Sequence, residues 1–291
     1  MHANTRIKVL LGVAALATAA TARADFAASS ATIAEKAKRA AEAGASLFPI
    51  TEKESVSVSF VKLGDDPWRL GLLQKAHVNA PVEKLVRAVD DTDAYVGIFQ
   101  DLVKSARRDA AGRDDYTLYT ETSIPVPFVA NDKTSMRYHI ERGKNYVLYH
   151  FHLVEGNHLT AYDGVALAIG DGTSGSLYWE IDFIEPGYGM NRALKPRKFW
   201  VQNAIGGAQS DWALKLKAEG SPDILTQSEK KANALEDRIA AAYDAPVPLE
   251  TLLAQAIPTS PSANASAKKP RSPAPSTAKP KQSGPKSEPK P

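Results

Sequence analysis

The pattern of hydrophobic and polar positions changes once along the chain, from alternation to helical spacing. Between residues 102 and 186 apolar and polar residues alternate, and short turn sequences such as Arg142-Gly143-Lys144-Asn145 interrupt the alternation. A period of two is typical of half-buried strands, and turns this short favour antiparallel hairpins. From Arg197 to about Ala218 the apolar residues recur at helical spacing, which predicts one long amphipathic helix.

Two strands are clearest, over 146–154 and 176–184, and each has one uniformly apolar face. Those faces consist of Val147, Tyr149, Phe151 and Leu153 in the first strand and Leu177, Trp179, Ile181 and Phe183 in the second. Glu180 and Asp182 lie on the opposite face of the second strand, and we expect them to face solvent because successive side chains alternate between the two faces.

Shorter elements surround this region. Asn79 is expected to cap a helix, with Pro81 presetting its first φ angle. The further elements that the pattern predicts are a helix over 31–47, strands over 56–60 and 70–78, and helices over 82–90, 95–99 and 227–243. This order predicts an α+β fold in which a long antiparallel sheet curls and the long helix closes its open side. The periodicity is compatible both with a filled core and with an open cavity between them.

The first residues are typical of a secretory signal. Arg6 and Lys8 are followed by a short apolar stretch and by Ala22-Arg23-Ala24, a small-x-small cleavage sequence. This pattern predicts a signal peptide over 1–24 and a periplasmic or secreted mature protein. The alternative is an uncleaved N-terminal anchor, which the short apolar stretch disfavours because a membrane span takes about 20 apolar residues.

Charge is distributed unevenly along the chain. Residues 258–291 are rich in Pro, Ser, Ala and Lys and carry a net charge of +6, whereas residues 25–257 carry −6. The tail is too polar to bury a core, so we expect it to be disordered. An acidic core argues against nucleic-acid binding. The tail is a candidate for contact with a membrane surface or cell-wall polymer, and the alternative is a solvated linker.

Candidate catalytic and metal-binding residues are few. The chain contains no cysteine, which excludes thiol catalysis and thiolate metal sites. His150 and His152 share one strand face, but a zinc site needs three or four ligands, so we expect surface histidines. Gly170-x-Gly172-x-x-Gly175 matches a dinucleotide fingerprint only superficially, because no helix follows it, and it predicts a hairpin turn. We expect no catalytic residue, no metal and no cofactor.

Two segments resemble a known family. The segment from His77 to Leu85, running into Tyr95, resembles the strand-to-helix entry of the helix-grip superfamily, which includes START lipid-transfer domains and polyketide cyclases. Ile124-Pro125-Val126-Pro127 with Asn131-Asp132 resembles the START pattern Pro-x-Pro followed by Arg-Asp, with Asn131 in place of the Arg. The resemblance covers about residues 55–220.

The resemblance implies a START-like ligand-binding domain over 55–220, preceded by a helical segment over 25–54 and followed by a helical extension over 221–257. Its sheet would grip the long C-terminal helix around a tunnel for a lipid, a sterol or another apolar molecule, entered near the first helices and the N-terminal end of the long helix. The expected cavity residues are Phe99, Tyr149, Phe151, Trp179, Phe183, Trp200, Ala204 and Ile205.

These features favour a non-enzymatic binder or carrier of an apolar ligand. One alternative is a cyclase or hydrolase built on the same cavity, which would need ionisable groups that point inward. A second alternative is an envelope-tethered protein-interaction module, which would show an exposed aromatic patch.

Overall fold

The computed structural model describes residues 3–50, 56–99, 103–109, 112–123, 130–187 and 195–255, with side chains from residue 21 to residue 254 of these ranges. Residues 124–127 of the Pro-x-Pro segment and the tail over 258–291 lie outside the described residues. Residues 1–257 form one compact unit.

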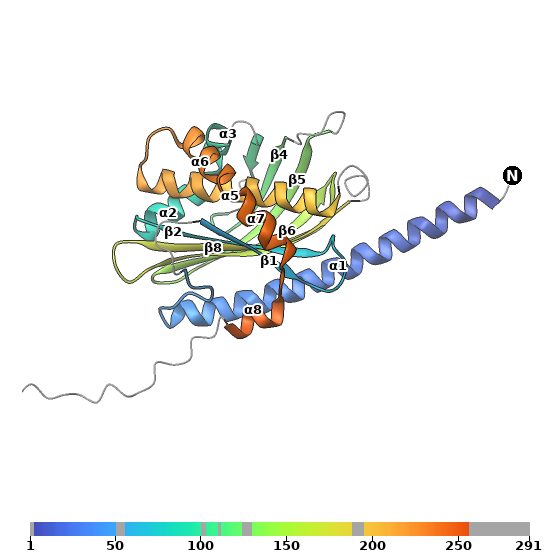
Figure 1. Ribbon diagram of the computed structural model, residues 1–291, viewed down its shortest axis with the longest axis horizontal. Helices are drawn as coiled ribbons and strands as arrows, with labels where there is room; N and C mark the ends of the chain where they lie inside the picture. The colour runs from blue at the N-terminus through green and yellow to red at the C-terminus, as the bar shows by residue number, and fades with distance from the viewer. Residues whose placement is uncertain are drawn as a thin grey trace, which may run out of the picture. The chain divides into compact units, whose positions relative to one another are not determined.

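Nine described strands form one curved sheet in the order β3-β4-β5-β6-β7-β8-β2-β1-β9 (Figure 1). The strands are β1 (Val56–Lys62), β2 (Leu70–Val78), β3 (Val103–Arg108), β4 (Asp115–Thr122), β5 (Asp132–Arg142), β6 (Tyr146–Gly156), β7 (Leu159–Gly170), β8 (Ser176–Pro186) and β9 (Val247–Pro248). Neighbours from β3 to β1 pair antiparallel, as predicted from the short turns, and only the two-residue β9 pairs in parallel, with β1.

Helices cover both faces of this sheet. One face carries α5 (Pro196–Glu219), with α2 (Val82–Asp90), α3 (Tyr95–Ile98), α6 (Ile224–Asn233) and α7 (Glu236–Asp244) on the same side, while α1 (Ala3–Glu42) and α8 (Leu249–Gln255) lie on the other (Figure 1). The 3₁₀ turn Thr92–Ala94 joins α2 to α3. The side that carries α5 is the inner, concave side of the sheet.

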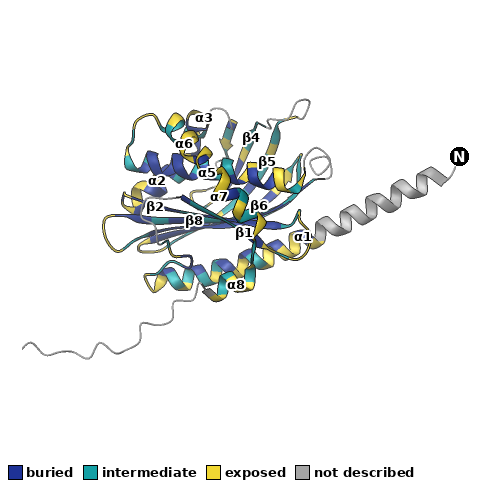
Figure 2. Cartoon of the chain, in the orientation of Figure 1, coloured by how far each residue is buried: buried dark blue, intermediate teal, exposed yellow. Residues whose placement is uncertain are grey.

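The long helix α5 forms because small and aromatic residues recur on one stripe. Trp200, Ala204, Ala208 and Trp212 are buried and pack against β1 and β2 (Figure 2). Gly220 ends the helix in a left-handed conformation with φ 73°, and the N–H of the following residue donates to the carbonyl of Leu216. A glycine at this position ends a helix without the steric cost that a side chain would add.

The convex face of the sheet is covered by the start of the chain. Phe26, Ile33 and Ala37 recur on one side of α1 and are fully buried against β7 and β8. Phe26 stacks on Phe183, with ring centroids 5.9 Å apart, and Phe48 after the helix meets Trp179 edge-on at 4.8 Å. The helix predicted over 31–47 is part of a longer one. α1 begins at Ala3, runs without a break through Ala24, and ends at Glu42.

Two local predictions were wrong, and one strand was not predicted. Pro81 itself is the N-cap of α2, and no side chain caps the helix; the backbone N–H of Asn79 instead donates to Glu219 Oε1 at 2.7 Å. The helix predicted over 227–243 is two helices, α6 and α7, separated at Ala234 and Leu235. The short strand β9 had no sequence signal, since two residues are too few for a visible alternation.

Candidate functional site

A cavity lies between the concave face of the sheet and α5. Its larger part has a volume of about 420 Å³ and its smaller part about 270 Å³. Both parts are lined by Leu118, Thr120, Thr122, Tyr138, Glu180, Ser210 and Leu214. These shared residues show that the two parts adjoin. Phe199 and the exposed Gln202 and Asn203, from the N-terminal half of α5, contribute one rim of the larger part.

Aromatic rings form much of the cavity floor. Tyr138 stacks on Tyr116, with centroids 5.0 Å apart and planes 7° from parallel, and it lies 5.3 Å from Phe151 on its other side. Phe151 in turn meets Tyr162 edge-on at 5.9 Å. The four rings come from β4, β5, β6 and β7, so neighbouring strands extend one aromatic surface across the sheet. Such a surface favours the burial of an apolar or aromatic molecule.

Three carboxyl groups also face this cavity. Glu180 and Asp182 project from β8, and Asp211 projects from α5 on the opposite wall. Asp182 is 5% exposed and Asp211 is 3% exposed, whereas Glu180 is partly accessible. A fourth carboxyl group, that of Asp132 at the start of β5, lines the larger part as well.

Hydrogen bonds hold two of the three carboxyl groups. Tyr178 donates its hydroxyl to Glu180 Oε2 at 2.5 Å, and Gln74 Nε2 donates to Asp211 Oδ2 at 2.8 Å. Asp182 lies beside Glu180 and the hydroxyl of Tyr162, both of which influence its pKa. Its Oδ1 is nevertheless buried without a hydrogen-bond partner. Oδ1 of Asp132 is unpartnered as well, so two acceptors on the cavity wall are unsatisfied, which is costly for buried polar atoms.

Burial raises the pKa of all three groups. The pKa of Asp182 lies well above its ordinary value because of desolvation and because of the neighbouring Glu180 charge. Desolvation and the same Glu180 charge raise the pKa of Asp211. Desolvation also raises the pKa of Glu180, which the hydrogen bonds from Tyr178 and Asp182 oppose. Two neighbouring carboxylates do not both ionise readily, so the proximity of Glu180 favours the protonated form of Asp182.

No cation balances these acids at the cavity wall. Among the described residues that line either part of the cavity, none is Lys, Arg or His.

The acid-lined wall is also closely packed, because a side-chain carbon on Gly207 of α5 would collide with the amide of Gln74. Gly207 thereby lets α5 approach β2, and both Gly206 and Gly207 line the larger part of the cavity.

The expected cavity residues fall into two groups. Phe99, Tyr149 and Phe151 line the smaller part of the cavity. Trp179 and Phe183 lie on the opposite face of the sheet, under α1, where they pack against Phe48 and Phe26.

The three expected residues from α5 also lie away from the cavity. Trp200 and Ala204 are buried between α5 and the β1–β2 pair, and Trp200 Nε1 donates to the carbonyl of Pro67 at 3.1 Å. Ile205 is half-buried beside the same cluster. Neither part of the cavity is lined by any of these three residues.

Strand register explains the misplaced aromatic residues. Tyr149 of β6 pairs with Ala166 of β7, which pairs with Glu180 of β8. Directly paired residues share a face, so the face that carries Tyr149 carries Glu180 and not Trp179. The expectation that Glu180 and Asp182 face solvent was therefore wrong. The sequence contained one indication of the correct face. The apolar stripe of α1, which includes Phe26, needs a sheet face to pack against, and that face carries Trp179 and Phe183.

The histidines lie away from the cavity. His150 Nε2 is 3.2 Å from Asp163 Oδ1 on the convex face, and His139 Nδ1 is 3.0 Å from Asp115 Oδ1. In the described part of the chain, no three His, Cys, Asp or Glu side chains are placed to hold a metal ion. The segment at 170–175 forms the hairpin turn between β7 and β8, as its sequence predicted.

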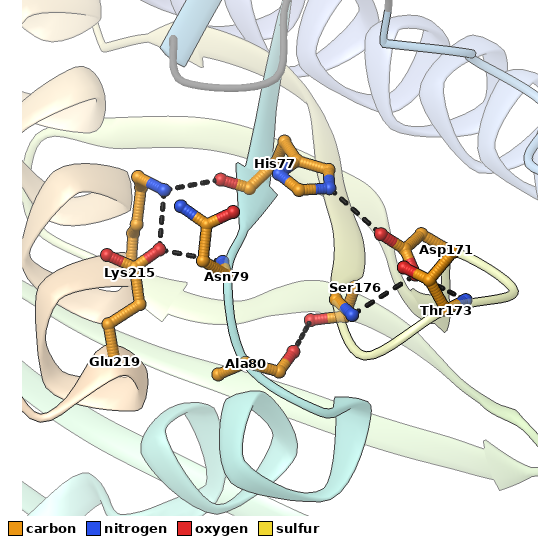
Figure 3. A network of polar contacts seen from close by, with 9 residues as sticks. His77, Asn79, Ala80, Asp171, Thr173, Ser176, Lys215 and Glu219 are labelled. Carbon is orange, nitrogen blue, oxygen red and sulfur yellow. Dashed lines mark hydrogen bonds and ion pairs between the residues drawn. The ribbon is translucent and has the colours of Figure 1, made fainter.

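A polar network ties α5 to the end of β2 (Figure 3). The buried ammonium group of Lys215 donates to the carbonyl of His77 at 2.7 Å and to Glu219 Oε1 at 2.6 Å. On the other side of β2, His77 Nε2 lies 3.0 Å from Asp171 Oδ2 in the β7–β8 turn. Burial opposes ionisation of Asp171, but hydrogen bonds from Thr173, His77 and backbone N–H groups lower its pKa to about 2. These contacts hold the C-terminal half of α5 against the end of β2.

A further hydrogen bond joins the β7–β8 turn to the start of α2. Ser176 Oγ donates to the carbonyl of Ala80 at 2.9 Å, which connects the start of β8 to the entry of α2 (Figure 3). At the other end of the sheet, Asn131 donates to Glu121 Oε1 at 2.7 Å, so the residue that stands in place of the START-type Arg is engaged within the β4–β5 pair.

Comparisons with known proteins give likenesses in structure only. No protein-family model matches the sequence, and no curated protein matches it. Similar solved structures include the STAR-related lipid transfer protein from Xanthomonas axonopodis, at 13% identity over 62% of this chain and 96% of that chain, with a TM-score of 0.43. Human STARD10 is 13% identical over 68% of this chain and 82% of its own, with a TM-score of 0.46.

A further similar structure is the Zhui aromatase/cyclase from Streptomyces, at 13% identity over 64% of this chain and 92% of that chain, with a TM-score of 0.36. The architecture of the present chain, a curved sheet that holds α5 across its concave face, is an α+β helix-grip fold. The fold class predicted from the sequence is confirmed.

Proposed function

We propose that the protein binds a hydrophobic ligand, such as a lipid or sterol, in the cavity between the sheet and α5, and that it carries this ligand rather than converting it. The observation that supports the proposal is the cavity itself, which has about 420 Å³ in its larger part and an aromatic floor. A ligand there would be held by burial of apolar surface, at about 25 cal/mol per Å². The carboxyl groups would orient its polar end.

A cavity-filling substitution tests this proposal. Ser210 lines both parts of the cavity, whereas the neighbouring Gln209 lines neither. We expect N-phenylnaphthylamine to bind the wild-type protein saturably with a rise in fluorescence. Ser210→Phe should weaken that binding about tenfold or more by occupying the space, and Gln209→Phe should not. Wild-type protein without saturable binding, or equal loss in both variants, would contradict a ligand site in this cavity.

One observation favours a second candidate, an enzyme of the cyclase or hydrolase kind. Glu180 and Asp182 adjoin inside the cavity and burial raises the pKa of both, and such a pair of carboxyl groups can act as a general acid and base. The measurement that separates the candidates is the chemical state of ligand recovered after incubation. Unchanged ligand supports a carrier, and a product that disappears in Asp182→Asn supports an enzyme.

The third candidate, a protein-interaction module, has less support. Among the described residues, the large apolar side chains that are exposed are Val96, Tyr119 and Val154. They come from α3, β4 and β6, and nothing joins them into an aromatic patch.

We further propose that the protein is exported and loses residues 1–24. The sequence of that segment supports export, and the residues that hold α1 on the sheet mostly follow the cleavage point, because Phe26, Ile33, Ala37 and Ala41 are buried there. In the described part of the chain, no helix is long and apolar enough to cross a membrane. The intact mass of protein recovered from the cell envelope would show the cleavage.

A further inference from the structure

We propose that the ligand is an amphiphile with a protonated amine, and that Asp182, Glu180 and Asp211 form the binding site for its ammonium group. This inference rests on the proposed binding function and names the chemistry of the ligand's polar end. The three side chains converge from two opposite walls, with Glu180 and Asp182 on β8 and Asp211 on α5.

An unsatisfied acceptor marks the point of attachment. Asp182 is 5% exposed, it lines the larger part of the cavity, and its Oδ1 has no hydrogen-bond partner. The remaining acceptors are partly engaged, by Tyr178 on Glu180 and by Gln74 on Asp211. An ammonium group carries three N–H donors, and it can therefore satisfy Asp182 while it approaches a second carboxyl group.

Charge distinguishes an amine from other polar ends. The described cavity wall contains four acidic side chains and no basic one. A fatty acid would place a further negative charge among them, which is unfavourable in a site of low dielectric constant. A hydroxyl group donates one hydrogen bond and leaves the other carboxyl groups uncompensated. An ammonium group supplies both donors and the missing positive charge, and charge-assisted hydrogen bonds are the stronger kind.

The aromatic floor fits the same ligand. Tyr138 and Tyr162 line the larger part of the cavity together with Asp182. Ring faces attract cations, most strongly where water is excluded. The rings therefore accommodate both the apolar body of the amphiphile and the region next to its ammonium group.

Binding of such a ligand changes the protonation of the site. In the empty cavity burial and the Glu180 charge raise the pKa of Asp182 and favour its protonated form. When the ammonium group donates its N–H to the ionised Asp182, the carboxylate and the ammonium form an ion pair, and a proton that Asp182 held before is released to solvent. The ligand keeps all of its own protons. At any pH below the raised pKa of Asp182, binding is thus coupled to proton release.

Three probes with the same tail test the inference by isothermal titration calorimetry: decylamine, decanol and decanoate. We expect decylamine to bind about tenfold more tightly than decanol, and decanoate to bind most weakly. Titrations in buffers of different ionisation enthalpy should show proton release with decylamine and none with decanol. The same comparison at rising pH should strengthen the binding of decylamine alone.

Substitution of Asp182 localises the effect. Asp182→Asn keeps the side-chain shape but cannot carry a negative charge, and it should weaken decylamine binding about tenfold while leaving decanol within about twofold. Asp163→Asn is the matched control, because Asp163 is a buried strand aspartate whose partner in the register is Phe183 on the convex face. It should change neither affinity. If Asp182→Asn does not fold, Asp211→Asn and the wild-type pH series apply the same test.

The outcomes separate the inference from the proposed function. Decanol that binds as tightly as decylamine, without proton release, would overturn the amine inference and leave a hydrophobic binding site in place. Equal effects of Asp182→Asn on both probes would overturn it as well. Failure of all three probes and of N-phenylnaphthylamine to bind would instead overturn the binding function itself.

Discussion

Asp211 illustrates at the scale of single residues what the acid-lined cavity costs the fold. It is buried on α5, accepts one hydrogen bond from Gln74, and lies close enough to Glu180 for that charge to raise its pKa. A protein without a polar ligand would gain stability from an amide or an apolar side chain at this position. Three such acids on facing walls are unfavourable for packing alone and fit the proposed polar ligand.

The raised pKa of Asp211 predicts a pH dependence of stability. Its pKa in the folded state lies above the ordinary value of 3.8. The stability that it contributes is therefore fully present below that value and is lost as pH rises through the raised pKa. We expect the free energy of unfolding of the wild-type protein, measured with urea, to fall as pH rises above the ordinary range of an aspartate, about pH 4.

Asp211→Asn cannot ionise and still accepts the hydrogen bond from Gln74. It should reduce this fall and raise the free energy of unfolding near pH 8 by about 1–3 kcal/mol, the cost of an uncompensated buried polar group. Asp171 does not interfere in this range, because its lowered pKa makes its contribution disappear only in acid, as pH falls toward about 2. Parallel pH profiles for the two proteins would contradict the burial of a carboxyl group at this position.

At the scale of elements, α1 is the feature that decides which sheet face is the cavity. The helix buries Phe26, Ile33 and Ala37 on the convex face, where Trp179 and Phe183 provide the apolar surface. Neither face of β8 is therefore open to solvent: one packs against α1, and the other lines the cavity. A strand covered on both faces loses the simple rule that its apolar side faces inward, since each side faces a buried environment.

This arrangement predicts that α1 affects stability and not ligand affinity. Ile33 is fully buried against the convex face. Ile33→Ala should lower the free energy of unfolding by about 2–5 kcal/mol, the range for such a deletion in a packed core. It should leave the affinity for N-phenylnaphthylamine unchanged, because the sheet separates it from the cavity.

Thr32→Ala provides the control for this variant. Thr32 is the adjacent, exposed residue of α1, and its substitution should change stability by less than about 0.5 kcal/mol. A similar small effect at Ile33, or a loss of probe binding in Ile33→Ala, would show that α1 does not act as a separate cover of the convex face.

For the whole molecule, the sequence predicted the elements better than the faces. Alternation and turn residues were sufficient for the antiparallel strands, and helical spacing was sufficient for α5, because both signals are local. The placement of Glu180 depended on pairing across β6, β7 and β8 and on a helix more than a hundred residues away in the chain. No local pattern contains that information, so the carboxyl cluster appeared only in the structure.

The distribution of charge over the molecule leads to a last prediction. Residues 258–291 carry +6 and residues 25–257 carry −6, so we expect an anionic membrane to repel residues 25–257 and to attract the tail. We expect the protein to cosediment with phosphatidylserine vesicles at about 0.05 M salt and to dissociate at about 0.5 M, because salt screens such contacts.

A full-length variant in which Gln replaces every Lys and Arg of the tail is the informative comparison. It should lose vesicle binding and keep the wild-type affinity for decylamine, because the cavity belongs to the folded unit. If the variant still binds vesicles, membrane contact would lie on residues 25–257. That outcome would contradict the prediction that the basic tail mediates binding. A carrier of cationic amphiphiles with a basic tail would approach an anionic surface through the tail and meet its ligand there, since such a surface concentrates ammonium groups as well.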